Sequence, residues 1–520
     1  MLMLLNLKNL ILQKKIEFFY AIIILGSGNM NLSKSRYTSG IRCEKLLWLN
    51  QYHPELAEDM GNESILENGN EVGNLARGLF GKSTLIDFNK GFESMINDTK
   101  ELLKQKPNVI CEASFNYDGN FCSVDVLKND VDGVEIYEVK SSTEVKEIYI
   151  DDISYQTWVL KKCGLNVKKS CIVYVNNQYV KNGAFDINQY FNIEDVSDIL
   201  RENDVVENVI KFKKVLDNKK EPSNDLSKTC HTPYDCPYFK YCTRNLPSPN
   251  VFDVGCNVRF TSKLEKYYNN WITYKDVLNN GGFNDKANEQ MEFEINNLPP
   301  KINKDAIKEL LSTITYPVYF LDFESYQSSI PTIDGTKPYQ QICFQYSLHY
   351  YLEPNGELFH KEYLSSDYDG NAMYGLCKQL CEDIPKNSCV LVYNDSFEKT
   401  RLQEMSDLFP EFQNHLLNIK EHIIDLLPPF KNHDYYVKEM HGSASIKKVL
   451  PSLFPNDDAL DYHNLDQVHK GDEASSAYLS LSNLSDEERE KLRYNMLKYC
   501  ELDTFAMVKI FDKLQEIVKD

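Results

Sequence analysis

Two series of alternating helical and strand-like patterns, separated by a proline-rich break, restrict how this chain folds. The first series runs to about Asn245, and the break follows at Leu246-Pro247-Ser248-Pro249-Asn250, which neither a helix nor a strand crosses easily. The second series opens with the apolar strand pattern Val318 to Phe323. Since strands alternate with helices on both sides of the break, the sequence predicts an α/β fold in each part.

The domain limits follow from this break and from a change of composition near the N-terminus. We expect domains at 30–245 and 311–520, a helical connector at 246–310 and an upstream extension at 1–29. The extension is rich in Leu, Ile and Phe, but its apolar run is far shorter than the ~20 residues that span a bilayer. It also lacks a convincing small-residue cleavage site, so we interpret it as the result of a mis-assigned start.

Cysteine content indicates the cellular compartment, and net charge limits the kinds of binding partner that the protein can have. The chain has 14 cysteines, too sparse for a disulfide scaffold, and we expect reduced thiols in a cytoplasmic protein that does not bind a membrane. Its 57 basic and 77 acidic residues give a net charge of −20. Phosphate binding is largely electrostatic, so this balance argues against a protein held on DNA by a general basic surface.

The first series carries charged residues at the ends of two predicted strands. The elements expected here are a helix, three strands, a helix and a strand, at 89–105, 108–115, 121–127, 134–140, 151–163 and 170–175. Asp125 ends one strand, and Glu138 and Lys140 share one face of the next because side chains alternate along a strand. Two converging carboxylates suit Mg²⁺ or Mn²⁺, and a neighbouring lysine can orient a water, an arrangement typical of phosphodiester hydrolysis. The structural alternative is a solvated Glu-x-Lys pair.

These residues, together with Gln156 on the following helix, resemble the PD-(D/E)xK nucleases, specifically the RecB-like branch. The resemblance implies a restriction-endonuclease-like fold in which Asp125 and Glu138 bind the metal and Lys140 and Gln156 take part in catalysis. In that branch a Tyr follows the Gln on this helix, whereas here Leu160 stands in that place.

Two further acids in this part are assigned by position alone. The RecB-like branch often has another metal ligand, commonly His, on an upstream helix, and the corresponding stretch offers Glu71 instead. Glu112 stands early in a predicted strand and is interpreted as an exposed structural residue.

Three cysteines near the end of the first series are regularly spaced. Cys230, Cys236 and Cys242 have five residues between neighbours, a spacing that fits neither the short pairs of structural zinc nor the ferredoxin patterns. The spacing is similar to the iron–sulfur staple of RecB-like nucleases, which implies Cys43 as the upstream partner and a structural [4Fe–4S] cluster. Zinc held by three cysteines with His231, and three unrelated thiols, are the alternatives.

The second series contains an apolar strand that ends in two acids. Asp322 and Glu324 share one face, and a buried strand should not end this way unless the acids are paired or bind a metal. Strands, a helix, a strand and a long C-terminal helix are expected at 341–351, 357–363, 370–382, 390–393 and 486–518. In the last helix Tyr499 and Asp503 are four residues apart and therefore on one face.

These segments resemble the DEDD exonucleases, the DnaQ-like group with a ribonuclease H-like fold. Asp322-x-Glu324 matches the first motif of that group and Tyr499-x-x-x-Asp503 the third. The resemblance implies that the four carboxylates of the group hold two divalent ions, with Tyr499 orienting the attacking water. The domain order implied for the whole chain is a restriction-endonuclease-like domain followed by a ribonuclease H-like domain.

The second motif of the group departs from the usual pattern. Tyr393-Asn394-Asp395-Ser396-Phe397-Glu398 fits it, with Glu398 in place of the usual Asp as the metal ligand, and Asp395 competes for that role. Asp425, at the end of a short apolar run, is a candidate to support the site from behind its ligands.

The stretch from Ile330 to Tyr346 resembles a bacterial family of unknown function that joins this exonuclease-like domain to a RecB-like one. We therefore expect a nuclease that acts on DNA with Mg²⁺ or Mn²⁺, with RNA left open as a substrate. The alternative is a degenerate nuclease that serves as a nucleic-acid or partner-binding module. Given the acidic total, binding to DNA should be weak, metal-dependent and salt-sensitive, with an unknown protein partner contributing to it.

Overall fold

The computed structural model describes residues 32–60, 63–105, 107–366 and 372–519, so the expected extension at 1–29 lies outside the described residues. The chain divides into two compact units, of which unit 1 comprises the residues up to Tyr179 together with Ala184–Asn245. Unit 2 comprises Val180–Gly183 and the residues from Leu246 onwards, so the division falls at the start of the proline-rich break. Both units combine helices with a mixed sheet, which confirms the general α/β class.

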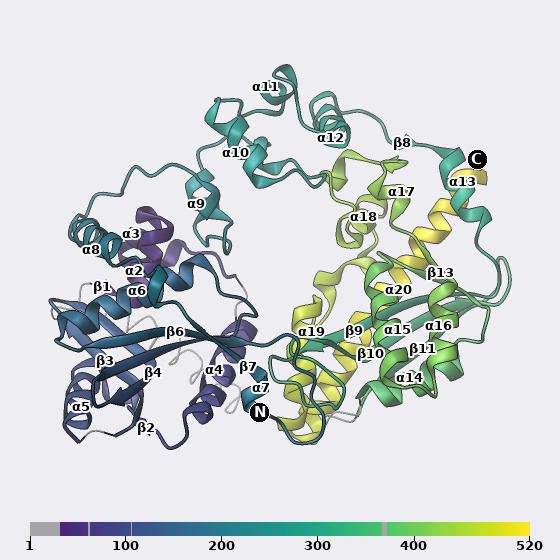
Figure 1. The fold of residues 1–520 in the computed structure, drawn as a ribbon. Coiled ribbons are helices and arrows are strands. Elements are labelled where there is room, and N and C mark those ends of the chain that lie inside the picture. Colours follow the sequence, from purple (N-terminus) through teal and green to yellow (C-terminus); the bar gives the residue numbers. More distant parts are fainter. Residues whose placement is uncertain (1–31, 61–62, 106, 367–371, 520) are drawn as a thin grey trace. The chain divides into compact units, whose positions relative to one another are not determined.

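Unit 1 is built on a sheet of seven strands (Figure 1). Its strands are β1 (Leu32–Ser33), β2 (Thr84–Leu85), β3 (Val109–Tyr117), β4 (Asn120–Asp130), β5 (Gly133–Lys140), β6 (Val167–Val175) and β7 (Phe191–Asp195). The order is β2-β3-β4-β5-β6-β7, with β1 pairing in parallel beside β4. Asp118 and Gly119 both have positive φ, the backbone that a tight hairpin between β3 and β4 needs. At Gly133 a Cβ would meet the Asn166 carbonyl oxygen at 2.3 Å, so only glycine fits between β4 and β5.

Helices cover this sheet and connect its parallel strands. They are α2 (Lys34–Arg42), α3 (Glu44–Tyr52), α4 (Glu63–Ala76), α5 (Phe92–Gln105), α6 (Glu147–Lys162), α7 (Ile187–Tyr190), α8 (Glu202–Asp217) and α9 (Phe239–Thr243). Helix α6 joins β5 to its parallel neighbour β6, and most of its side chains are buried. Figure 1 shows α2, α3, α6 and α8 gathered on one side of the sheet. The core between them includes Tyr155, whose ring stacks on Tyr37 with centroids 4.6 Å apart.

Unit 2 has a five-stranded sheet of order β11-β10-β9-β12-β13. Its strands are β9 (Val318–Gln327), β10 (Gln341–Tyr351), β11 (Leu358–Leu364), β12 (Cys389–Val392) and β13 (Ile423–Asp425), and β8 (Lys301–Ile302) and β14 (Tyr435–Tyr436) form a separate pair. Strands β9, β10 and β11 are antiparallel, whereas β12 is parallel to both β9 and β13. The carboxyl ends of β9, β12 and β13 therefore meet at one edge of the sheet, where ligands bind in open α/β sheets.

The helices of unit 2 fall into two groups along the chain. Those that precede the sheet are α10 (Phe260–Tyr268), α11 (Tyr274–Asn279), α12 (Asp285–Asn296) and α13 (Lys304–Ser312). Those that follow β9 are α14 (Ala372–Asp383), α15 (Ser396–Leu408), α16 (Gln413–Glu421), α17 (Pro428–Lys431), α18 (Ile446–Leu453), α19 (Gly471–Ser480) and α20 (Asp486–Lys519). The 246–310 segment expected as a connector is helical and belongs to unit 2, where it has a small core of its own that includes Val254 and Met291. Helix α20, with 34 residues, packs across β9 and β10.

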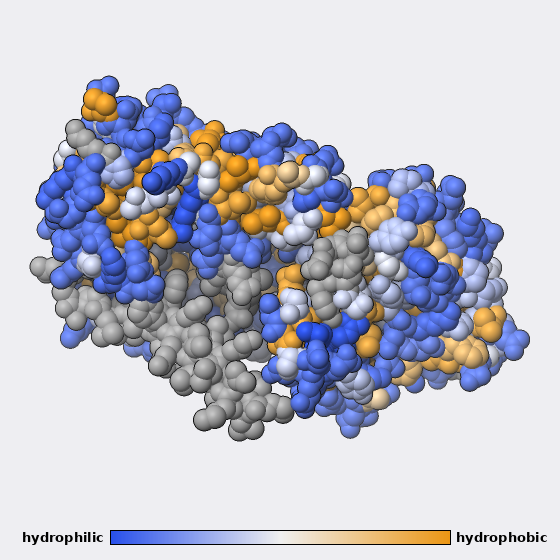
Figure 2. Space-filling view, turned by 90° about the horizontal axis from the view of Figure 1, so that it is seen from below, coloured by the Kyte–Doolittle hydropathy of each residue, from blue (hydrophilic) through white to orange (hydrophobic). Residues whose placement is uncertain are grey.

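The described surface is mixed in polarity. On the face shown in Figure 2, hydrophobic residues form patches between hydrophilic ones. None of the helices among the described residues has both the length and the apolar character needed to cross a membrane.

Candidate functional sites

The acids and the lysine predicted in unit 1 lie together at the carboxyl end of β5. Glu138 is buried, with only 2% of its surface exposed, and its Oε1 accepts hydrogen bonds from Lys140 Nζ at 2.6 Å and from Lys34 Nζ at 2.8 Å. Asp125, on the neighbouring strand β4, accepts a hydrogen bond from the Val139 amide at 2.7 Å. The strand pair thus brings both carboxylates and the lysine into one group, as the alternation of side chains predicts.

Helix α6 completes this group from one side of the sheet. Gln156 is fully buried, and its Nε2 donates to Glu138 Oε2 at 2.7 Å and to Asp152 Oδ1 at 3.0 Å. Asp152 also accepts from Lys140 Nζ at 2.7 Å. The buried amide and the second carboxylate therefore hold Glu138 and Lys140 in place.

The charges in the group act strongly on one another. Burial and the neighbouring Glu138 carboxylate raise the pKa of Asp125 to about 7. Burial alone disfavours ionised Glu138, but the Lys140 and Lys34 ammonium groups outweigh it and hold the pKa of Glu138 well below its usual range. Two carboxylates whose pKa values move in opposite directions are a pattern typical of functional sites.

The sequence analysis does not predict two members of the group, Asp152 and Lys34, and its interpretation of Glu112 is wrong. Asp152 is four residues before Gln156 on the same helix face, a spacing that could have revealed it, whereas nothing in the pattern points to Lys34. Glu112 was interpreted as exposed, yet it is half-buried, has a φ of 58° and pairs with Arg77 at 3.2 Å. Glu71 lies exposed on α4, and nothing in the described residues connects it to the acidic pair.

The four predicted cysteines line a single cavity in unit 1. Cys43 lies between α2 and α3, and Cys230, Cys236 and Cys242 come from the segment around α9. Burial raises the pKa of Cys242 to about 11 against the opposing effect of the Lys45 ammonium, and the other three thiols add to the rise because they are close. The convergence of four thiols from distant parts of the chain fits a metal or cluster with four thiolate ligands.

The loop that carries three of these cysteines is tied to the helices that precede the sheet. Arg42 Nη2 donates to the carbonyl oxygens of Thr229 at 3.2 Å and Tyr234 at 2.6 Å. Tyr238 is buried and donates its hydroxyl to Asn50 at 2.9 Å. His231 does not line the cavity, and its Nδ1 contacts Asp235 instead, which argues against three cysteines with His231 as the ligand set.

The predicted acids of unit 2 converge around the middle of its central strand, β9, which does not end at Asp322 and Glu324 as expected but continues to Gln327. Asp322 and Glu324 lie on β9, Glu398 lies in the first turn of α15 directly after β12, and Asp503 lies on α20. Glu324, Glu398 and Asp503 are buried, and Asp322 is partly buried. One oxygen of Glu398 has no hydrogen-bond partner in the described structure, which is a costly state for a buried carboxylate.

The mutual effects of these acids show how close they are. Burial and the Asp503 carboxylate raise the pKa of Glu324 to about 8, and burial, followed by Asp503, Glu324 and Glu398, raises that of Asp322 well above its usual range. Burial also raises the pKa of Glu398 to about 8. Like charges so close together do not all ionise unless cations compensate them, and carboxylate oxygens are ligands that divalent ions such as Mg²⁺ favour.

Basic and hydroxyl groups surround these acids. Tyr499 is buried one turn before Asp503, and its hydroxyl accepts a hydrogen bond from Lys447 Nζ at 3.2 Å. Tyr462 donates its hydroxyl to Asp503 Oδ1 at 2.6 Å. Lys447 and Tyr462 were not predicted from the sequence, because they come from segments with no periodicity that relates them to α20.

The structure separates the two candidates of the second motif. Asp395 is partly exposed and pairs with Lys399 one turn along α15, whereas Glu398 points into the acidic group. Asp425 accepts hydrogen bonds from the amides of Asn394 at 2.8 Å and Leu427 at 2.9 Å. It therefore holds the turn that precedes Glu398, and its role in supporting the site stays a prediction.

Two sets of side chains in unit 2 bring possible metal-ligand atoms within 4.8 Å of one another. One is Asp322, Glu324 and Cys500, within the acidic group. The other is His349, His360 and Glu501. Two neighbouring hydroxyl groups contact its histidines, Thr504 at 2.8 Å from His349 and Ser347 at 2.9 Å from His360. These hydroxyls also contact each other at 2.7 Å, and they join β10 and β11 to the helix that carries Asp503.

Comparison with known proteins places part of this chain among uncharacterised relatives. Residues 319–445 match the model of a domain of unknown function, DUF2779, which includes Asp322, Glu324 and Glu398 but ends before Asp503. The chain is 30% identical over 223 residues to "Uncharacterized protein MG366" of Mycoplasma genitalium, and 31% identical over 210 residues to its homolog in Mycoplasma pneumoniae. These matches cover 39% and 37% of this chain, and 32% and 31% of the relatives, so the chain spans about a third of their length.

Proposed function

We propose that this protein is a metal-dependent nuclease that hydrolyses phosphodiester bonds of DNA. Unit 2 would carry a 3′–5′ exonuclease-like site and unit 1 a RecB-like site. The observation that carries the proposal is the convergence of four mostly buried carboxyl groups in unit 2, brought from β9, α15 and α20 to one edge of the sheet. Proteins rarely bury carboxyl groups together unless a cation compensates their charge.

The topology of unit 2 supports a ribonuclease H-like fold. Three antiparallel strands are followed by two parallel ones, and the first acids lie on the central strand β9. Asp322, Glu324, Glu398 and Asp503 would hold Mg²⁺ or Mn²⁺, which would activate a water and stabilise the leaving 3′ oxygen. The Tyr499 hydroxyl, which accepts a hydrogen bond from Lys447, would orient that water.

The arrangement in unit 1 supports a restriction-endonuclease-like fold of the RecB-like branch. An antiparallel pair, β4 and β5, carries Asp125, Glu138 and Lys140, and the crossover helix α6 adds Gln156. Asp125 and Glu138 would bind the metal, and Lys140 would hold a water or a phosphate oxygen. Glu71 remains a prediction as a further ligand, one that requires α4 to turn its exposed side chain toward the group.

The thiol cavity supports a [4Fe–4S] cluster held by Cys43, Cys230, Cys236 and Cys242. All four side chains line the cavity, whereas His231 does not. The cluster would tie the start of the described chain to the end of unit 1. The cluster would contribute to stability and not to catalysis, because Asp125 and Glu138, the acids of the proposed RecB-like site, do not line this cavity.

A degenerate, binding-only module is the second candidate function. In unit 1 both Lys34 and Lys140 contact the same oxygen of Glu138, so that carboxylate is neutralised without a metal. In unit 2 Glu398 replaces the usual Asp. Calorimetric titration with Mg²⁺ and Mn²⁺ separates the two candidates, since a degenerate site would bind these ions no more tightly than the protein surface does.

Cleavage of labelled single-stranded DNA by the purified protein with Mg²⁺ or Mn²⁺ tests the main proposal. Absence of metal-dependent cleavage of any DNA or RNA substrate, in protein that contains the cluster, would overturn it.

The site in unit 1 has its own test. Lys140→Ala should lower the cleavage that depends on unit 1 by about 100-fold or more, because it removes a charge placed at the reacting phosphate. Lys128→Ala is the matched control, since Lys128 lies exposed on the same sheet and pairs only with Glu135 at 3.3 Å. Rates measured in an Asp503→Asn background isolate this site. Equal rates for both lysine variants would exclude Lys140 from catalysis.

A further inference from the structure

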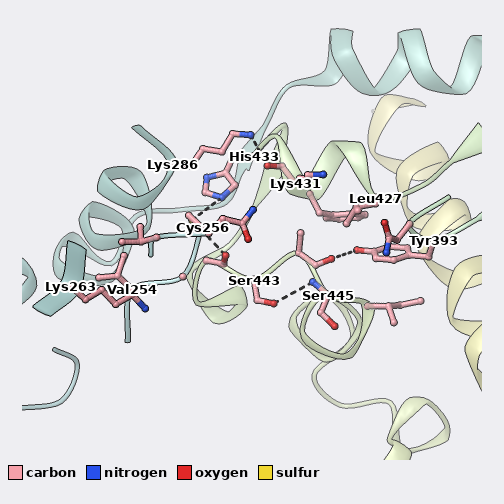
Figure 3. Close-up of a pocket in the computed structure, with 18 residues that line it drawn as sticks. Val254, Cys256, Lys263, Lys286, Tyr393, Leu427, Lys431, His433, Ser443 and Ser445 are labelled. Carbon is pink, nitrogen blue, oxygen red and sulfur yellow. Dashed lines mark hydrogen bonds between the residues drawn. The ribbon is translucent and has the colours of Figure 1, made fainter. Parts of the chain in front are cut away.

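Unit 2 contains a cavity of about 730 Å³ between two segments that are far apart in the sequence (Figure 3). One segment contributes Val254, Cys256, Lys263 and Lys286, and the other runs from Leu427 to Ile446. Tyr393 and Asn394, directly after β12, complete the lining. The volume falls in the range of about 300–1,000 Å³ that is usual for ligand pockets.

The charge of the lining is opposite to that of the protein. Lys263, Lys286 and Lys431 line the cavity together with His433, and none of the lining residues is Asp or Glu. The whole chain has a net charge of −20. A concave surface with one sign of charge concentrates ligands of the other sign, so this cavity selects an anion.

The three lysines retain donors for such a ligand. Lys263 Nζ donates to the Phe252 carbonyl at 3.0 Å, and Lys286 Nζ donates to the Lys431 carbonyl at 2.7 Å and to Asn432 Oδ1 at 3.3 Å. An ammonium group has three donors, so both keep hydrogen-bonding capacity. Burial lowers the pKa of Lys263, as expected for a partly buried cation without a full counter-charge.

The two walls are joined by hydrogen bonds that keep the cavity in shape. The Cys256 amide donates to the Gly442 carbonyl at 2.9 Å, and His433 contacts Cys256 Sγ at 3.7 Å and Glu289 at 2.7 Å. Gly442 has a φ of 71°, and a Cβ there would meet Gln290 Oε1 at 2.2 Å. A cavity formed before binding avoids part of the entropic cost of ordering its ligand contacts.

Two residues of the cavity wall are close in sequence to residues that contact the acidic group of the exonuclease-like site. Asn394, on its wall, donates its amide to Asp425 at 2.8 Å and stands four residues before Glu398, just outside α15. Ile446, on the opposite wall, is followed by Lys447, which contacts Tyr499 at 3.2 Å. Both walls thus continue into residues around the four carboxyl groups.

We propose that this cavity binds the phosphate backbone of a single DNA strand next to the site that cleaves it. The inference rests on the proposed function and assigns the grip on the substrate to Lys263, Lys286 and Lys431. A cavity of about 730 Å³ accommodates a short stretch of one strand more readily than the two paired strands of a duplex. A local basic cavity also explains how a strongly acidic chain binds DNA.

The test measures the affinity of the full chain for a short, fluorescein-labelled oligothymidylate by anisotropy. An Asp503→Asn/Lys140→Ala background, with Mg²⁺ present, slows cleavage at both proposed sites and keeps the divalent ion on which binding is expected to depend. The Lys263→Gln/Lys286→Gln/Lys431→Gln variant should bind more weakly, and its slope of log affinity against log salt should fall by ~2, or ~0.7 for each phosphate that a lysine no longer neutralises. Glutamine keeps donors for the bonds to the Phe252 and Lys431 carbonyls.

The matched control removes three exposed lysines of unit 2 that do not line the cavity, Lys308, Lys378 and Lys519. It should keep the affinity and slope of the parent protein. Lys431→Glu, a single change at an exposed side chain, should weaken binding on its own and excludes misfolding as the cause. Equal losses in cavity and control variants, unchanged binding in the cavity variant, no binding by the parent protein, or preference for duplex over single-stranded DNA would each overturn the proposal.

Failure of this inference is distinguishable from failure of the proposed function. If the cavity variant degrades DNA from the 3′ end with an unchanged KM while Asp503→Asn loses that activity, the nuclease assignment stands and the cavity assignment is wrong. If no nuclease activity exists but binding still depends on the three lysines, the cavity assignment stands and the catalytic one is wrong.

Discussion

Asp503→Asn should lower the rate of metal-dependent nucleotide release from the 3′ end of DNA by about a thousand-fold. The change removes one of four carboxylates that would hold the metal ions, a loss of several kcal/mol of transition-state stabilisation. Asparagine has nearly the same volume and still accepts the hydrogen bond that Tyr462 donates at 2.6 Å, so the fold should persist. Single-turnover assays with DNA labelled at either end measure the effect and the polarity.

Two variants on α15 are the controls for this result. Glu398→Gln should reduce the rate to a similar extent, because Glu398 is buried in the acidic group. Asp395→Asn should leave the rate close to that of the parent protein, since Asp395 is partly exposed and pairs with Lys399. Loss of activity in Asp395→Asn with retention in Glu398→Gln would reverse the assignment of the second motif.

Cys236→Ser should remove the visible absorption of anaerobically purified protein and destabilise unit 1. Iron bound by thiolates absorbs visible light, whereas zinc does not. A cluster that joins Cys43 to the segment around α9 closes a very long loop, and losing such a cross-link costs on the order of 5 kcal/mol by chain entropy. Absorption spectra, metal analysis and the unfolding of unit 1 followed by hydrogen exchange measure these effects.

Cys163→Ser is the matched control for the cluster. Cys163 belongs to the same unit, but it is exposed and lies outside the cavity. It should keep the colour and the stability of the parent protein. A colourless parent protein that contains zinc, or equal behaviour of the two serine variants, would exclude the iron–sulfur assignment.

Most strands and helices that position the sites could be predicted from local patterns. The strands expected at 108–115 and 134–140 are observed at Val109–Tyr117 and Gly133–Lys140, and the helix expected at 89–105 at Phe92–Gln105. The helix expected at 151–163 begins earlier, at Glu147. This start could not be predicted because Lys146, the residue before the helix, makes no side-chain cap that would mark it. The alternation of apolar residues in strands and their spacing in helices depend only on neighbours along the chain, so both patterns predict these elements without knowledge of the fold.

The contacts that complete each site could not be predicted in the same way. Lys34 reaches Glu138 across more than a hundred residues, and Lys447 reaches Tyr499 across more than fifty. Glu112 adopts a positive φ inside a strand, and the local sequence pattern does not predict this backbone conformation. The basic cavity could not be predicted either. Nothing in the sequence distinguishes Lys263, Lys286 and Lys431 from other lysines, and they come together only because two distant segments face each other.

By itself, therefore, the sequence determined the α/β class, the strands that carry the acids, and the regular spacing of Cys230, Cys236 and Cys242, since each of these depends on residue type and short-range spacing. Cys43 was assigned only from the resemblance to RecB-like nucleases. Only the tertiary structure decided that Glu398 rather than Asp395 faces the acidic group, and that His231 stays away from the thiols. It also decided where positive charge gathers in an acidic chain. The physical reason is that burial, pairing of charges and the shape of a cavity depend on which distant segments pack together.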